Sequence, residues 1–169
     1  MLRAGRTGRS PDGWWEGEIH PPSALGDLLP EADYVVLTIP HTPETEGLFS
    51  APQFKLMKST ASIINIARGP TIRIDDLDAA LRSGEIGGAA LDVFEIEPLP
   101  KEHPLWTAPN VVITPHVAVA QMYQPGTSTD PRGFPSLADE RVFATTAENI
   151  RRFLRGQELL NPVDKEKWF

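Results

Sequence analysis

The sequence contains no cysteine among its 169 residues. A disulfide framework and a thiolate metal site are therefore both excluded, and thiol usage says nothing about the redox compartment. We expect no metal site of any other kind. The absence of cysteine also means that the fold must be held together by its hydrophobic core and its hydrogen bonds.

Long apolar runs are also missing. No stretch approaches the roughly 20 residues needed to cross a bilayer, and no signal-peptide core follows Met1. These absences predict a cytoplasmic protein that makes no membrane contact. Three arginines near the amino terminus imitate the start of a mitochondrial presequence, but the glycines and the proline between them favour a turn.

Positive charge is scarce. The net charge is −7 and the isoelectric point is about 5.1, which disfavours a nucleic-acid-binding protein that works through a general positive field. A small molecule or another protein is the expected partner. The hydrophobic fraction of 40% is ordinary for a soluble globular chain, and the length allows one domain.

Four short apolar runs give the chain its organisation, and none of them alternates cleanly with polar residues. Continuous runs of this length are typical of strands that helices bury on both faces of a parallel sheet. The predicted strands cover residues 34–39, 62–67, 88–94 and 110–114.

Helical segments are predicted between these strands and after the last of them. They cover residues 23–29, 51–57, 75–83 and 137–154, with Gly84 and Gly156 as the residues that end the last two. Strands that alternate with short helices predict an α/β fold built from parallel β-α-β units.

Ionisable side chains follow three of the predicted strands. They are Arg68, Glu97 and His116. Each has a purely structural interpretation: the arginine caps a helix or faces solvent, the glutamate belongs to a loop before a proline, and the histidine is a hydrogen-bonded structural residue. Ligands bind at the carboxyl ends of the strands in open parallel sheets, so the coincidence of three such residues indicates a functional site.

The motifs around these residues, taken in order along the chain, resemble the D-isomer-specific 2-hydroxyacid dehydrogenase family. The most informative are the Asn-Ile-Ala-Arg-Gly segment that ends at Gly69, the Leu-Asp-Val-Phe segment that ends at Phe94, and the Thr-Pro-His segment that ends at His116. The full series covers residues 32–40, 41–45, 63–69, 77–81, 88–94, 97–100, 103–106 and 110–116.

The resemblance implies hydride transfer between a nicotinamide and the carbon of a 2-keto acid. It implies that Arg68 binds the substrate carboxylate through paired hydrogen bonds, for which a planar guanidinium is suited. His116 is the implied general acid/base, because imidazole exchanges protons near neutral pH. Glu97 is implied to hydrogen-bond that imidazole and to favour its protonated form.

The resemblance also implies a set of cofactor contacts. Asp92 is expected near the nicotinamide carboxamide, and Ile39, Pro40 and Thr45 are expected along the ribose and pyrophosphate. The remaining implied contacts are Arg6, Thr7, Ile66, Ala67, His116 and Ala118. The cofactor is NAD or NADP, and the arginine at position 6, where an acid would select NAD, favours NADP.

The family's G-x-G-x-x-G loop, which holds the pyrophosphate at a helix N-terminus, does not occur in this sequence. We therefore expect a partial Rossmann-type parallel sheet that lacks its first strand, glycine-rich loop and first helix. Residues 1–155 would form this incomplete NAD(P)-binding domain, and residues 156–169 a tail that in the family returns to the substrate domain. With the strands near Val35 and Ile64 counted as third and fourth, the order 3-2-1-4-5-6 predicts a gap between them.

Several alternatives stay open at this point. Met1 is an internal start in a longer gene, the chain is a degenerate fragment, or a second polypeptide supplies the rest. The main functional hypothesis is a 2-keto acid reductase that is inactive in this truncated form, with homodimerisation expected only if the domain is complete. The alternatives are a non-catalytic nucleotide-sensing interaction module and an inert gene fragment.

Overall fold

The computed structural model describes Ala4, residues 19–118 and residues 134–162, with the side chains of residues 134–143 left out. The chain divides into two compact units, Met1–Pro115 and His116–Phe169. Each unit is described by itself below.

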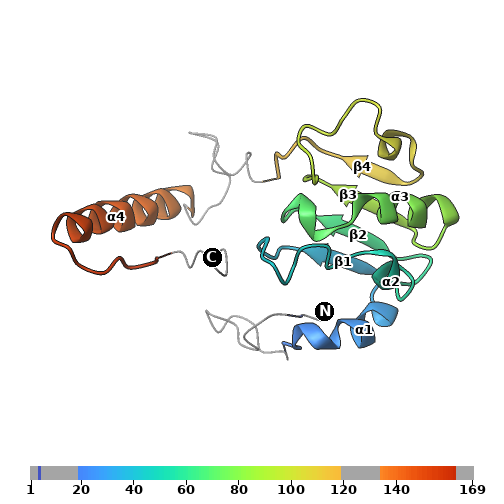
Figure 1. Cartoon of the computed structure of the whole chain (residues 1–169), viewed down its shortest axis with the longest axis horizontal. Helices are drawn as coiled ribbons and strands as arrows, with labels where there is room; N and C mark the ends of the chain where they lie inside the picture. Colours follow the sequence, from blue (N-terminus) through green and yellow to red (C-terminus); the bar gives the residue numbers. More distant parts are fainter. Residues whose placement is uncertain (1–3, 5–18, 119–133, 163–169) are drawn as a thin grey trace. The chain divides into compact units, whose positions relative to one another are not determined.

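A parallel sheet of four strands forms the centre of the first unit. The strands are β1 (Tyr34–Leu37), β2 (Ser62–Asn65), β3 (Gly88–Leu91) and β4 (Val111–Ile113). They lie side by side in chain order, and every neighbouring pair is parallel (Figure 1). The predicted α/β class and all four strands are therefore confirmed, although each strand ends one to three residues earlier than the apolar run that predicted it.

Short helices connect these strands. They are η1 (Pro22–Ala24), α1 (Leu25–Leu28), η2 (Leu29–Glu31), α2 (Ala51–Phe54), η3 (Gly69–Thr71), α3 (Ile74–Ser83) and η4 (Pro104–Thr107). Ser50 and Gln53 form a capping box at the start of α2, which satisfies backbone N–H groups that the helix leaves unbonded. Gly84 ends α3 with a φ of 72°, a left-handed conformation that favours glycine.

The predicted gap between the strands near Val35 and Ile64 is wrong. Val35 pairs directly with Ile63, and Val36 pairs with Ile64, in one uninterrupted ladder between β1 and β2. The error lies in counting β1 as the third strand of the order 3-2-1-4-5-6. In that order the third strand is not a neighbour of the fourth, whereas β1 pairs directly with β2, so β1 is not the third strand when β2 is the fourth. Among the described residues, the open backbone edges therefore lie on the outer sides of β1 and β4 and not inside the sheet.

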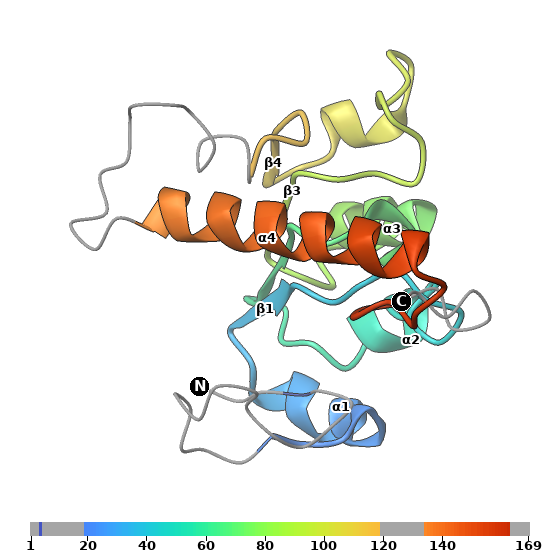
Figure 2. The same ribbon diagram turned by 90° about the vertical axis from the view of Figure 1, so that its left-hand side faces the viewer.

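The two faces of the sheet differ in how well they are covered. On one face, Leu37, Ile63 and Leu91 are buried in a core that includes Phe54 of α2 and Leu77 of α3. Figure 2 shows α2 and α3 together on this side of the strands.

The opposite face carries a row of apolar register partners that includes Val36, Ile64, Ala90 and Val112. Val36 is 53% exposed, Val112 is 62% exposed, and Tyr34 on the same face of β1 is 72% exposed. Parallel sheets are normally covered by helices on both faces, so this face is incomplete within the part of the chain that the structure describes.

The second unit is built around the helix α4 (Phe134–Leu154). The chain turns after it at Gly156, whose φ is 64°, and the following segment folds back on the helix. Asn149 fixes this return, because its Oδ1 accepts from the Leu160 N–H at 2.9 Å and its Nδ2 donates to Asn161 Oδ1 at 2.8 Å. The predicted helix and its glycine terminator are confirmed. Among the described residues, no helix has the length and apolarity that crossing a membrane would need.

Candidate active site at the carboxyl ends of the strands

The turn that carries Arg68 is held by Asn65, the last residue of β2. Asn65 is only 1% exposed, and its amide forms hydrogen bonds in both directions. Its Oδ1 accepts from the Ala67 N–H at 3.0 Å, and its Nδ2 donates to the Arg68 carbonyl at 3.1 Å. A buried amide bonded in this way fixes the backbone on both sides of position 68.

The Arg68 side chain itself lies at the surface. Its Nη1 donates to the Ala67 carbonyl at 2.7 Å, and the residue as a whole is exposed. The backbone of Arg68 is extended and leads directly into η3. The guanidinium is thus attached to a rigid turn while its remaining donors stay accessible to a ligand.

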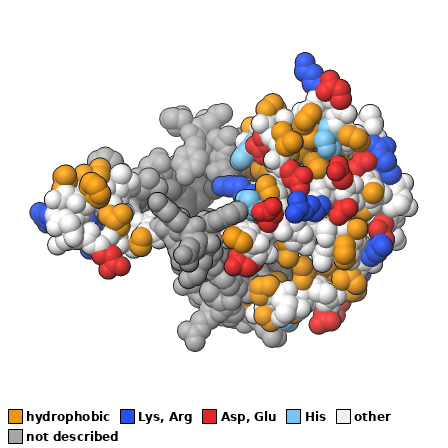
Figure 3. Space-filling view, viewed as in Figure 1, with side chains coloured by type: hydrophobic (Ala, Val, Ile, Leu, Met, Phe, Trp, Pro, Cys, Tyr) orange, Lys and Arg blue, Asp and Glu red, His pale blue; other side chains and the backbone are white. Residues whose placement is uncertain are grey.

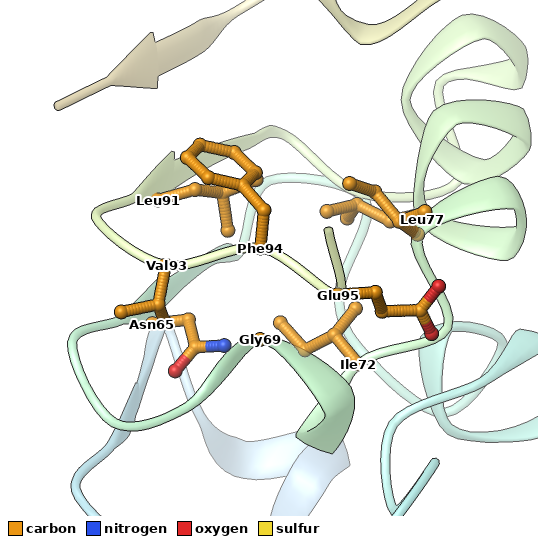
Figure 4. Close-up of a pocket in the computed structure, with 9 residues that line it drawn as sticks. Asn65, Gly69, Ile72, Leu77, Leu91, Val93, Phe94 and Glu95 are labelled. Carbon is orange, nitrogen blue, oxygen red and sulfur yellow. The ribbon is translucent and has the colours of Figure 1, made fainter. Parts of the chain in front are cut away.

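Gly69 lets this turn pack directly against the loop that follows β3. A Cβ at position 69 would lie 1.8 Å from the carbonyl carbon and oxygen of Phe94, a distance that no side chain tolerates. Figure 4 shows the backbone at Phe94 and Glu95 passing close to Gly69, with the Asn65 side chain pointing towards the same turn. The close approach brings the Arg68 turn next to the loop that carries Glu97.

Glu97 is exposed on this loop. Its Oε1 accepts a hydrogen bond from the Phe94 N–H at 2.9 Å, and the bond between Glu97 and Pro98 is a cis peptide. The hydrogen bond from the Phe94 N–H orients the Glu97 carboxylate relative to its own loop. Its predicted pairing with His116 stays a prediction.

Asp92 is buried directly after β3. The Thr114 hydroxyl, one residue beyond β4, donates to its Oδ1 at 2.5 Å, and the Asp92 N–H donates to the Asn65 carbonyl at 3.0 Å. Burial of a carboxylate is costly unless it is hydrogen-bonded. Thr114 supplies such a bond and holds the Asp92 side chain in place.

The loop after β1 is folded by its own threonines. The Thr45 hydroxyl donates to the Pro40 carbonyl at 2.7 Å and accepts from the Thr42 N–H at 2.8 Å. Pro40 is exposed and Ile39 is half-buried. Thr45, predicted as a polar cofactor contact, thus has its hydroxyl proton bonded within the loop, and it shapes the backbone on which Ile39 and Pro40 lie.

A charged network joins this loop to the loop that follows β3. Arg73, just before α3, lies 3.9 Å from Glu46 and 3.8 Å from Glu95, measured between side-chain nitrogen and carboxylate oxygen. Burial raises the pKa of the Glu95 carboxyl, and the attraction of Arg73 only partly opposes this effect. Figure 3 shows acidic and basic side chains mixed on the surface of this unit rather than separated into patches of one sign.

The other predicted contacts fall in different parts of the chain. Ala67 is buried and Ile66 is exposed, both in the Arg68 turn. His116 and Ala118 are exposed and belong to the second compact unit, with His116 at a φ of 55°. Arg6 and Thr7 lie outside the described residues.

Sequence reasoning missed the residues that hold these loops, namely Asn65, Thr71, Thr114 and Thr42. All four are polar residues, and two of them, Asn65 and Thr114, lie at the ends of predicted strands, where a buried polar residue needs hydrogen-bond partners. That rule marks Asn65, which is the last residue of β2, as a loop organiser. It does not reveal which loop each residue holds.

Comparisons with known proteins identify the family of this chain. Residues 10–118 match the family model described as "D-isomer specific 2-hydroxyacid dehydrogenase, NAD binding domain". The chain belongs to this dehydrogenase family. It is thus a relative of NAD(P)-dependent glyoxylate/hydroxypyruvate reductases, and the family resemblance stated from the motifs is confirmed.

Two curated relatives show how much of such a dehydrogenase this chain spans. Glyoxylate/hydroxypyruvate reductase B of Citrobacter koseri is 54% identical over 96 residues, which are 57% of this chain and 30% of that protein. Glyoxylate/hydroxypyruvate reductase A of Photorhabdus laumondii is 37% identical over 145 residues, which are 86% of this chain and 41% of that protein. The chain therefore spans well under half the length of these two dehydrogenases.

Solved structures of dehydrogenases from the family share the fold. A D-isomer specific 2-hydroxyacid dehydrogenase of Xanthobacter autotrophicus Py2, solved with NADPH and MES, has a TM-score of 0.70 and 38% identity. The match covers 95% of this chain and 59% of that one. The NADPH-dependent glyoxylate/hydroxypyruvate reductase of Sinorhizobium meliloti, solved with NADP and sulfate, has a TM-score of 0.69 and 32% identity, and the match covers 98% of this chain and 48% of that one.

Proposed function

We propose that this chain carries the catalytic part of an NAD(P)-dependent 2-keto acid reductase, with Arg68, Glu97 and His116 as its catalytic residues. The observation that supports it best is the packing of the Arg68 turn on the Glu97 loop, where Gly69 meets Phe94 at backbone distance. In a dehydrogenase of this family, that contact brings an anion-binding cation and a carboxylate to one edge of the sheet.

Each residue has a distinct task in the proposed reduction. Arg68 binds the substrate carboxylate through two parallel N–H donors and polarises the adjacent carbonyl. His116 donates a proton to the carbonyl oxygen as the carbon is reduced. Glu97 favours the protonated imidazole through its negative charge. The bound nicotinamide would supply the hydride.

The residues present fit the nicotinamide end of the cofactor but not its pyrophosphate. Asp92 is a buried acceptor at the end of β3 that suits a carboxamide N–H, and the Ile39 and Pro40 loop offers apolar contact. The sequence has no G-x-G-x-x-G loop to bind the pyrophosphate through backbone N–H groups. Arg6 favours NADP over NAD, and the solved relatives that contain NADPH or NADP support this preference.

Two losses make the chain inactive by itself in this proposal. The 169 residues contain no G-x-G-x-x-G loop to bind the pyrophosphate, and by themselves they include no counterpart of the family's substrate domain to exclude water and hold the keto acid, a positioning effect worth roughly 7–11 kcal/mol in favourable cases. Calorimetric titration with NADH and NADPH, together with a keto-acid-dependent absorbance assay, should show no tight binding and no turnover. Micromolar binding with measurable turnover would contradict this part of the proposal.

The catalytic assignment is tested in a chimaera that joins this chain to the amino-terminal part of the Photorhabdus reductase. The chimaera should reduce glyoxylate or hydroxypyruvate.

Arg68→Lys should lower kcat/KM for the keto acid far more than cofactor affinity, because a lysine ammonium cannot form the paired contact. His116→Ala should depress reduction at every pH, and Glu97→Gln should move the pH optimum to lower values. An unchanged kcat/KM in Arg68→Lys would refute the role of Arg68.

A further inference from the structure

Thr71 lies at the centre of the hydrogen bonds that hold the Arg68 turn. It is completely buried in η3, and its hydroxyl donates to the Arg68 carbonyl at 2.7 Å. The same hydroxyl accepts from Asn65 Nδ2 at 3.2 Å, and the Thr71 N–H also points to the Arg68 carbonyl at 3.3 Å. Asn65 and Thr71 therefore both donate hydrogen bonds to the carbonyl oxygen of Arg68.

We propose that Thr71 is a positioning residue that fixes the direction of the Arg68 side chain through the Arg68 carbonyl. The part of this inference that concerns substrate binding rests on the proposed function of Arg68. Thr71 touches no reacting group itself and acts through the backbone of the residue three positions before it.

The hydroxyl, rather than the volume of the side chain, is what this role needs. A valine at position 71 would fill the same space, but it would remove one of the three donors to the Arg68 carbonyl and leave one N–H of the Asn65 amide without its buried acceptor. An unsatisfied buried polar group is costly, and the turn can relieve that cost only by opening or rotating. Opening of the turn would move the Arg68 Cα and therefore the position of the guanidinium.

The surrounding packing makes such a movement matter at the site. Gly69, directly after Arg68, lies against the backbone of Phe94 with no room for a side chain. Phe94 in turn donates its N–H to Glu97. A turn that is no longer held at the Arg68 carbonyl therefore changes the spacing between Arg68 and the Glu97 loop.

Two conservative substitutions separate the hydroxyl from the packing. Thr71→Val keeps the shape and removes the hydroxyl, whereas Thr71→Ser keeps the hydroxyl and removes a buried methyl group. If the only role of Thr71 is to fill space in the core, the serine variant should be the less stable of the two. If Thr71 positions Arg68, the valine variant should have the looser turn even where its global stability is the higher.

The first measurement is amide hydrogen exchange in the 169-residue chain. The Ala67 N–H, which bonds to Asn65 Oδ1, reports the turn, and the Ala89 N–H, which bonds to the Asn110 carbonyl in the sheet, reports global opening. The ratio of the Ala67 exchange rate to the Ala89 rate should rise roughly tenfold in Thr71→Val, as expected for the loss of one buried hydrogen bond. The ratio should stay near the wild-type value in Thr71→Ser. An unchanged ratio in Thr71→Val overturns the proposal.

The second measurement uses oxalate as a probe of Arg68. The Nε–H resonance of Arg68 is assigned in the wild type by its absence in Arg68→Lys. Titration with oxalate should shift this resonance, and the affinity obtained should fall about tenfold in Thr71→Val and recover in Thr71→Ser. Equal oxalate affinity in the wild type and Thr71→Val overturns the positioning role. If the wild type shows no oxalate response while the exchange ratio still rises, the hold on the turn is supported and the carboxylate site of the proposed function is refuted.

Discussion

The two faces of the sheet differ more than any other two regions of this molecule. The face under α2 and α3 buries Ile63 completely, and the loops at its carboxyl edge are joined by Asn65 and Gly69. The opposite face exposes Tyr34 and Val36. Among the described residues, the face whose loops position Arg68 and Glu97 is therefore finished, whereas the opposite face is left uncovered.

The largest expected effect on stability comes from Gly69→Ala, which tests how tightly the Arg68 turn packs against the loop after β3. The new Cβ would collide with the Phe94 backbone, which cannot move aside as a flexible side chain would. We expect a loss of stability at or above the upper end of the roughly 1–3 kcal/mol typical of overpacking. Urea denaturation followed by circular dichroism would measure it.

Gly84→Ala is the matched control for this substitution. Gly84 has a φ of 72°, and a Cβ there would meet nothing within 4 Å. Its cost should therefore be only the left-handed strain, roughly 1 kcal/mol. A Gly69→Ala variant no less stable than Gly84→Ala would show that the Arg68 turn and the loop after β3 are not in contact in solution.

The next prediction compares the stability lost on truncating two neighbouring isoleucines of β2 whose side chains lie on opposite faces of the sheet. Ile63→Ala should cost roughly 2–5 kcal/mol, because it leaves a cavity in the buried core. Ile64→Ala should cost only about 1 kcal/mol, because Ile64 is half-buried on the open face. The midpoints of urea unfolding give both values, and equal losses would mean that the second face is covered in solution.

A smaller effect is expected on aggregation at the open edge of β1. The carbonyls of Asp33 and Leu37 accept from the Ser62 and Ile66 N–H groups, so the alternation of the strand directs the backbone groups of Val36 outwards. Within the described part of the chain, no strand pairs with that side of β1. An uncharged open edge invites pairing with other chains, and lysine suppresses it. Val36→Lys should therefore slow aggregation, as followed by light scattering.

Val112→Lys provides the control for the edge. Val112 lies on the same face with similar exposure, but its backbone belongs to the side of β4 that pairs with β3. Both variants reduce the apolar area of the face, whereas only Val36→Lys places a charge next to open backbone groups of β1. Equal slowing by the two variants would assign the aggregation to the face rather than to the edge.

The sequence predicted the strands well because both faces of each strand carry apolar side chains, although one of these faces is exposed among the described residues. It also predicted that Arg68 and Glu97 follow the strands that are β2 and β3 in the structure, because motif order fixes chain order. The gap beside Val35 was wrong because strand neighbours depend on pairing over long range, which a single sequence does not encode locally. Thr71 was missed for a related reason: its hydroxyl matters only once the turn brings it to the Arg68 carbonyl.

The smallest expected effect concerns Glu95, which lies on the finished side of the molecule. Burial raises the pKa of its carboxyl, and the attraction of Arg73 lowers it by less. An acid whose pKa is raised by folding contributes stability that is fully present below its unfolded pKa and is lost as pH rises through the folded pKa. At neutral pH the ionised carboxylate therefore costs stability, and Glu95→Gln should make the chain slightly more stable there. The advantage should vanish as pH falls below the ordinary range of glutamate, about 4.3. Urea midpoints measured across this range would test it, with Glu102→Gln in an exposed turn as the control for net charge. A Glu95→Gln variant that is less stable than the wild type at neutral pH would mean that the ion pair with Arg73 outweighs the burial of the charge.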